Sequence, residues 1–85
     1  MIERVVMQSR KTPSGSITAL VNRGEDWSPR AVADVVADIR SGRYRYLVPW
    51  PGGTVLVRVA DGPDDVVDAD RPDGRAGGLA LLPNG

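Results

Sequence analysis

Three arginines and two leucines have the types and spacing of a surface that binds another molecule. Side chains two residues apart in a strand lie on the same face of a sheet. Arg45 would therefore lie beside Leu47, and Leu56 beside Arg58, on one face of two paired strands. A basic face with two exposed leucines suits an acidic protein surface or a nucleic-acid backbone. The candidate contact residues are Arg43, Arg45, Leu47, Leu56 and Arg58.

The apolar C-terminal segment offers an alternative for the same leucines. Residues 79–83 contain three leucines that can fold back over Leu47 and Leu56 and enclose them in a second small core. Residues 1–60 carry an excess of four positive charges and residues 61–85 an excess of four negative charges. This asymmetry favours the docking, although each surface ion pair contributes only about 0–1 kcal/mol. In that arrangement the face opens only when the segment is displaced.

The chain lacks the residues that most often carry catalysis or bind metals. It has no histidine and no cysteine, which excludes the commonest general base near neutral pH, thiol nucleophiles and the usual zinc sites. The one lysine, Lys11, is predicted to lie in a turn, and the serines have no histidine to act as their base. Neither Gly52–Gly53 nor Gly77–Gly78 matches a phosphate-binding loop. We therefore expect no enzyme, no cofactor and no metal site.

Two groups of carboxylates are candidates for cation binding. Asp34 and Asp38 are four residues apart and share one face of a helix, where paired carboxylates can share a proton or hold a cation. They lie off the apolar stripe, so we expect a solvated polar face. A second group lacks the spacing of a calcium loop, and we expect it to form a solvated acidic edge. Its members are Asp61, Asp64, Asp65, Asp68, Asp70 and Asp73.

The best-defined element is a helix over residues 29–41. Valine and isoleucine recur at i, i+3, i+4 and i+7 from Val32, which predicts one apolar stripe along the helix. Ser28 is predicted to cap the N-terminus, and Pro29 is predicted to be the first helical residue. Gly42 fits the left-handed position that commonly ends a helix.

Two predicted hairpins flank this helix. β-branched and alternating apolar residues, separated by turn residues, indicate the strands. The strands cover 2–9, 16–22, 44–50 and 54–60, with 65–69 compatible with a short edge strand and 79–83 forming an apolar tail. The sequence thus predicts an α+β fold, a small single domain over 1–85 of order β-β-α-β-β(-β). Its one helix packs on a face of an antiparallel sheet.

The second hairpin has the clearest predicted register. A two-residue turn at Gly52–Gly53 places three inward-facing pairs between its strands. These pairs are Trp50–Val55, Val48–Val57 and Tyr46–Val59. Their side chains share the face beneath the helix, and the arginines of the same strands then face outward.

The same landmarks are similar to those of a known group of small proteins. The matching residues are Ile17, Ile39 with Gly42, Tyr44 and Tyr46, Val55 to Val59, Pro72-Asp73-Gly74 and Leu79 to Pro83. This layout resembles a small bacterial family of domains of unknown function, of about this length and with a Leu-Pro ending. The chain departs from the family pattern at 68–70 and 75–78. The resemblance implies a hairpin–helix–hairpin fold and brings no activity with it.

Length and composition complete the functional expectation. A chain of 85 residues has a thin core, which favours self-association. The first residues do not form a signal peptide, and no apolar run approaches the roughly 20 residues of a membrane span. We expect a cytoplasmic protein-interaction module that binds a protein partner or a second copy and does not bind membranes. The alternative is a nucleic-acid-binding accessory protein that uses the arginine-rich hairpin face, against which the net charge of zero weighs.

Overall fold

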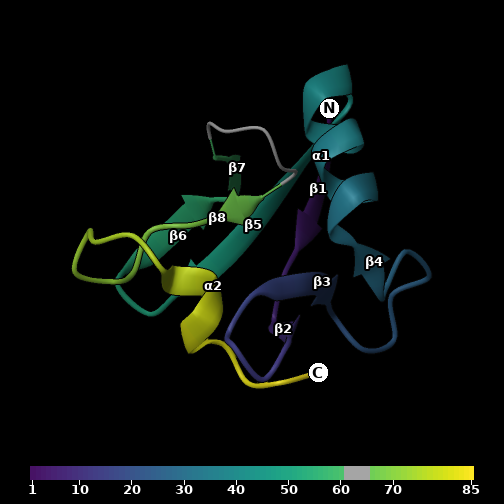
Figure 1. The fold of residues 1–85 in the computed structure, drawn as a ribbon. Coiled ribbons are helices and arrows are strands. Elements are labelled where there is room, and N and C mark those ends of the chain that lie inside the picture. Colours follow the sequence, from purple (N-terminus) through teal and green to yellow (C-terminus); the bar gives the residue numbers. More distant parts are fainter. Residues whose placement is uncertain (61–65) are drawn as a thin grey trace.

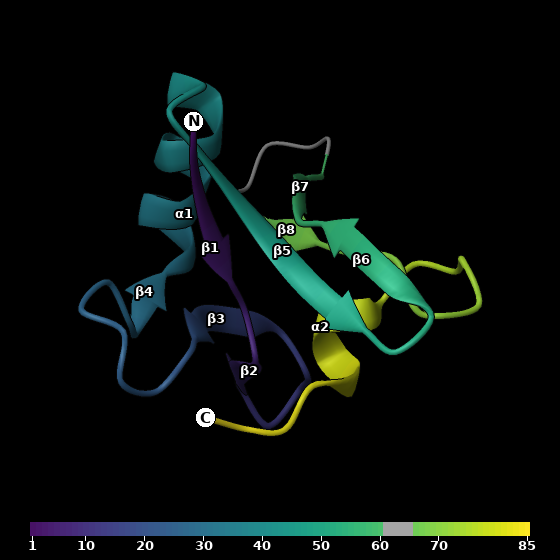
Figure 2. The same cartoon turned by 180° about the vertical axis from the view of Figure 1, so that it is seen from behind.

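One main helix and several short strands make up the fold (Figures 1 and 2). They enclose a single cluster of buried side chains, which is aliphatic except for Tyr46. The computed structural model describes residues 1–60 and 66–85. The helices are α1 (Val32–Ser41) and α2 (Gly78–Leu81). The strands are β1 (Ile2–Val5), β2 (Gln8–Lys11), β3 (Ile17–Val21), β4 (Arg30–Ala31), β5 (Tyr44–Trp50), β6 (Gly53–Leu56), β7 (Arg58–Val59) and β8 (Val67–Asp68).

The strands of the described residues form three small sheets of mixed direction. β5 lies between β1, which is parallel to it, and β6, which is antiparallel to it. β3 lies between β2 and β4, and β7 pairs with β8. This mixture of one main helix with mostly antiparallel sheets is the predicted α+β class. The predicted single antiparallel sheet is wrong, because the strands are divided among the three sheets.

The helix shows the predicted apolar stripe and the predicted end, but it begins later. Val35 is fully buried, and the α-helix ends at Gly42 in the left-handed conformation, with φ 73°. Ser28 does not cap the helix, because Ala31 is the residue that precedes the first helical turn and no side chain caps it. The Oγ of Ser28 instead accepts a hydrogen bond from the N–H of Asn22 at 2.9 Å. Residues 30–31 pair with β3 as β4, so the helix starts at Val32, and the prediction that it begins at Pro29 is wrong.

The segment predicted as one strand over 2–9 is two strands in different sheets. β1 pairs in parallel with β5, whereas β2 forms the expected antiparallel hairpin with β3. Val6, which is fully buried, lies between the two strands. The prediction failed for β1 because a parallel partner lies far away in the sequence, beyond an intervening crossover, and local alternation carries no sign of it.

The β5–β6 hairpin keeps its predicted faces but not its predicted register. Its turn is Pro51–Gly52, and Trp50 pairs with Gly53, which shifts every pair by two residues. Gly53 closes the hairpin at φ 149°, a conformation that glycine tolerates. A shift of two residues leaves each side chain on its original face. Tyr46 is therefore fully buried, as expected.

The C-terminal part packs against the domain in an unexpected place. The strand predicted over 54–60 is divided, because β7 pairs with β8 rather than with β5. Asp61, Asp64 and Asp65, from the predicted acidic edge, and the first residue of the predicted strand over 65–69 lie outside the described residues. In the tail over 79–83, Leu79 and Leu82 are buried with the main core, beside β2. The tail therefore does not cover Leu56, which is 52% exposed.

Candidate functional site

An apolar row crosses the outer face of the β1–β5–β6 sheet. The strand register places Val5 beside Leu47, and Leu47 beside Leu56. Val5 is 39% exposed and Leu56 is 52% exposed, and Leu47 between them is half-buried. The neighbouring position on β5, Tyr46, points into the core, so the row faces outward by simple alternation. The structure thus brings the two predicted leucines together and adds Val5, which sequence reasoning missed.

The arginines predicted to make this face basic are engaged with carboxylates. Arg45 lies beside Glu3 on the neighbouring strand, and the two side chains form an ion pair. Arg58 belongs to β7 and contacts Asp70 at 2.8 Å and Asp68 at 3.4 Å. These pairs neutralise much of the local positive charge. The face is therefore an apolar row bordered by paired charges rather than a basic surface.

Arg43 lies apart from that row. It is exposed in the connection between Gly42 and β5, and its carbonyl accepts the N–H of Ile2 at 2.9 Å. This bond joins the start of β1 to the start of β5. Of the five predicted contact residues, Arg45, Leu47 and Leu56 lie in one sheet, while Arg43 and Arg58 flank it.

Asp38 is the centre of a polar cluster that sequence reasoning missed. It was predicted to be solvated with Asp34, but it is only 8% exposed. Its carboxylate accepts two hydrogen bonds from Arg30, both at 3.0 Å, one from the hydroxyl of Tyr46 at 2.5 Å and one from Arg4 at 3.2 Å. The helix therefore turns this carboxylate toward β1, β4 and β5, whereas Asp34 stays exposed.

The cluster holds its groups in their usual protonation states. Burial alone would raise the pKa of Asp38, but hydrogen bonds from Arg30 and Tyr46 and the positive charges of Arg30 and Arg4 hold it below its ordinary value. Burial and the hydrogen bond to Asp38 raise the pKa of the Tyr46 hydroxyl. The guanidinium of Arg4 also lies over the ring of Tyr44, with its Cζ 4.2 Å from the ring centroid. A carboxylate with these partners has a structural role and is not poised to accept a proton.

A serine and a lysine also meet inside the protein. Lys11 lies on β2 rather than in the predicted turn, and its Nζ donates to the Oγ of Ser9 at 3.0 Å. Ser9 is fully buried, and its hydroxyl donates to the carbonyl of Leu79 at 2.7 Å. Nζ also donates to the carbonyl of Leu82 at 2.8 Å. This pair attaches the C-terminal segment to β2, and its burial keeps a substrate from reaching the serine.

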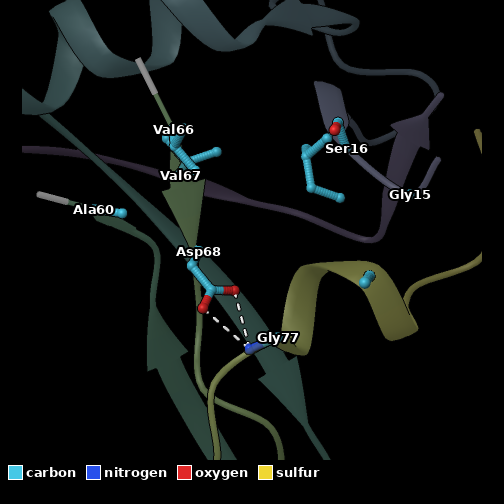
Figure 3. A pocket seen from close by; sticks show the side chains of 9 residues that line it. Gly15, Ser16, Ala60, Val66, Val67, Asp68 and Gly77 are labelled. Atoms are coloured by element: carbon cyan, nitrogen blue, oxygen red, sulfur yellow. Dashed lines mark hydrogen bonds between the residues drawn. The ribbon is translucent and has the colours of Figure 1, made fainter. Parts of the chain in front are cut away.

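A shallow hollow of about 450 Å³ lies between the β2–β3 turn, β8 and α2 (Figure 3). Figure 3 shows Val66, Val67 and Asp68 along one wall, with Gly15 and Ser16 across from them. Its volume is within the range of small-ligand pockets. Asp68 is the charged residue of the lining, and its carboxylate already accepts the N–H of Gly77 at 3.0 Å. The lining therefore offers a small apolar surface without a pair of acid and base groups.

Metal-binding groups, membrane-spanning helices and similarity to known proteins are also guides to function. Among the described residues, no three acidic, histidine or cysteine side chains are grouped as a metal site would need. In the same residues, no helix has both the length and the apolar character to cross a membrane. No protein-family model, curated protein or solved structure matches the chain. We therefore infer function from the contacts described above.

Proposed function

We propose that this protein is a protein-interaction module and that the outer face of the β1–β5–β6 sheet is its contact surface. The observation that carries the proposal is the exposed row of Val5, Leu47 and Leu56. Aliphatic side chains that follow one another across three strands form a continuous apolar surface. Removing such a surface from water gains about 25 cal/mol for each Å², and part of this gain offsets the freedom that two partners lose when they associate. The proposal includes the cytoplasmic location expected from the sequence.

The charges around the row support a protein partner over a nucleic acid. Productive protein interfaces place apolar residues at the centre and polar residues at the rim. Here Glu3 with Arg45, and Arg58 with Asp68 and Asp70, form ion pairs near the row. A phosphate backbone would have to compete with these carboxylates for each arginine. An apolar protein surface would leave the pairs intact at the rim.

Two leucines of equal exposure provide a matched test. Leu56 is 52% exposed within the apolar row, whereas Leu81 is 51% exposed on α2, away from the sheet. We expect Leu56→Lys to reduce capture of a specific partner by at least about tenfold, the loss typical of one residue at the centre of an interface. Leu81→Lys should leave capture unchanged.

The measurement is quantitative affinity capture from the native host, with the wild-type chain and both variants in parallel. A protein that is retained by the wild type and by Leu81→Lys, but not by Leu56→Lys, supports the proposal. The same set of captured proteins from all three chains would contradict it. Circular dichroism of each variant separates a lost contact from a lost fold.

A further inference from the structure

The free edge of β6 has unpaired backbone groups. In the β5–β6 ladder, the N–H of Val57 donates to the carbonyl of Tyr46 at 2.8 Å, which identifies a hydrogen-bonded pair. Antiparallel ladders alternate such pairs with pairs whose backbone groups point away from each other. The N–H and C=O groups of Thr54 and Leu56 therefore point away from β5. Within the described residues, β6 has no second neighbouring strand to receive them.

The other strand edges are covered, charged or very short. The outer edge of β2 is covered by the chain end, because Ser9 N–H donates to the carbonyl of Pro83 and Gly85 N–H donates to that of Ser9, both at 3.1 Å. The edge of β1 carries charged residues, and the amide of Asn22 donates to the carbonyl of Val5 at 2.9 Å. β4 has only two residues. These are the usual ways in which proteins protect a strand edge from other chains.

β6 has none of these protections in its own sequence. Its four residues are Gly-Thr-Val-Leu, without a charge or a proline, and Gly53, Thr54 and Leu56 are exposed. Valine and threonine favour strand pairing. Figure 2 shows β6 at the end of its sheet, with β5 on one side only. A hollow of about 220 Å³ adjoins Thr54 and Val55 and has residues 70–74 as its opposite wall, which leaves room for side chains of an added strand.

We propose that β6 pairs with β6 of a second copy of this chain. An antiparallel arrangement about a twofold axis at Val55 places Thr54 of one copy opposite Leu56 of the other. The four outward N–H groups then meet four outward C=O groups, so the edge is complementary to itself. The chain has a net charge of zero and β6 has no charged residue, so two copies approach without repulsion.

This inference deepens the proposed function and rests on it, since it names a second copy as a partner of the sheet at Leu56. The pairing joins two three-stranded sheets into a continuous six-stranded one and adds contacts along the Leu56 side. Four residues from each chain bury less than the roughly 1,200 Å² of a standard interface. The dimer is therefore weak and exchanges rapidly, and it must be measured over a wide range of concentration.

The decisive variant removes one donor from the free edge. The N–H of Thr54 makes no bond to β5, so Thr54→Pro leaves the internal ladder intact. Because both copies lose this donor, the substitution deletes two of the four hydrogen bonds between them. Thr54→Val is the matched control, because it keeps the N–H and has nearly the same shape. In sedimentation equilibrium, the mass of the wild type and of Thr54→Val should rise with concentration toward twice the monomer value. Thr54→Pro should stay at the monomer mass.

Amide exchange in the wild-type chain provides an independent readout by NMR. Exchange of the Thr54 and Leu56 amides should slow as concentration rises, while exchange of the Val55 amide, already paired within the hairpin, should not change. A constant monomer mass with unchanged Thr54 and Leu56 exchange overturns the inference. If Thr54→Pro does not fold, Thr54→Lys, which keeps the hairpin and adds like charges across the axis, takes its place.

A variant of the apolar face separates this inference from the proposed function. Leu47→Lys alters the apolar face but not the edge of β6. If the dimer is lost in Leu47→Lys and kept in Thr54→Pro, the two copies associate through their apolar faces. That result would overturn the edge pairing and support the face as a contact surface. A dimer lost in Thr54→Pro and kept in Leu47→Lys supports the edge. Loss of partner capture by Leu56→Lys, without any dimer, would leave the proposed function standing alone.

Discussion

Asp38 joins the helix to the sheet through charged and hydroxyl donors, so its charge should contribute to stability. Removing the charge in Asp38→Asn leaves Arg4 and Arg30 facing an amide, and their side chains are only 17% and 34% exposed. Breaking one side of such a partly buried pair should lower the free energy of unfolding by about 3 kcal/mol. Asp34→Asn, an exposed carboxylate on the same helix, should change it by less than about 0.5 kcal/mol. Urea denaturation of both variants at pH 7 measures the difference.

The effect of Asp38 on the free energy of unfolding should also depend on pH, in a direction that its pKa determines. The pKa of Asp38 is lower in the folded protein than in the unfolded chain, where it is about 3.9. Its contribution to stability is therefore present above that value and is lost as the pH falls through the folded pKa. The gap in unfolding free energy between the wild type and Asp38→Asn should be widest near neutral pH and should close in acid. A gap that stays constant from neutral to acidic pH would show that the charge of Asp38 does not stabilise the fold.

At the scale of elements, the packing of α2 against residues 69–70 requires glycine at position 78. A Cβ on Gly78 would lie 2.6 Å from the carbonyl oxygen of Asp70 and 2.7 Å from that of Ala69, both of them backbone atoms. Gly78→Ala should therefore displace the segment that buries Leu79 and lower the free energy of unfolding by about 2–3 kcal/mol. Gly52→Ala is the control, because its Cβ would meet nothing within 4 Å. Equal urea midpoints for the two variants would contradict this account.

The elements also show which features a sequence specifies locally. The stripe of α1 and its end at Gly42 follow from spacing and from the conformational freedom of glycine, and both are present. For the β5–β6 hairpin, the predicted register is wrong by two residues, but the predicted inward and outward faces are correct. A shift of two residues leaves every side chain on the same face of the sheet. The division of residues 2–9 between two sheets depends on β5, which local patterning does not connect to β1.

The polar cluster was missed for a related reason. Asp38 was assigned to solvent because it lies off the valine stripe, yet a carboxylate beside a stripe is buried when donors converge on it from other elements. One signal was available, since Arg4 lies two residues before the buried Val6 and alternation directs both inward. Its acceptor could be found only after β1, β4 and β5 were placed around α1. By contrast, the exposed leucines of the candidate face follow from alternation within one hairpin, so the sequence could locate them.

At the scale of the whole molecule, folding brings carboxylates beside arginines of the positively charged part of the chain. The first sixty residues have an excess of positive charge, which alone would favour a nucleic acid. In the folded chain, Arg4 and Arg30 contact Asp38, Arg45 contacts Glu3, and a carboxylate from the acidic C-terminal part contacts Arg58. These contacts place a carboxylate directly beside four of the arginines. The long-range field that would steer a phosphate backbone is correspondingly weak.

This pairing of charges predicts weak or absent binding to nucleic acids even at low ionic strength. In fluorescence anisotropy with short DNA and RNA at about 50 mM salt, where counterion release most favours binding, the wild-type titration should stay flat. The double variant Glu3→Gln and Asp70→Asn is the matched control, because it removes one negative charge beside Arg45 and one beside Arg58. It should bind more strongly than the wild type, and added salt should abolish that binding. Tight, steeply salt-dependent binding by the wild type would instead favour the nucleic-acid alternative, since it would show that phosphates displace the carboxylates from these arginines.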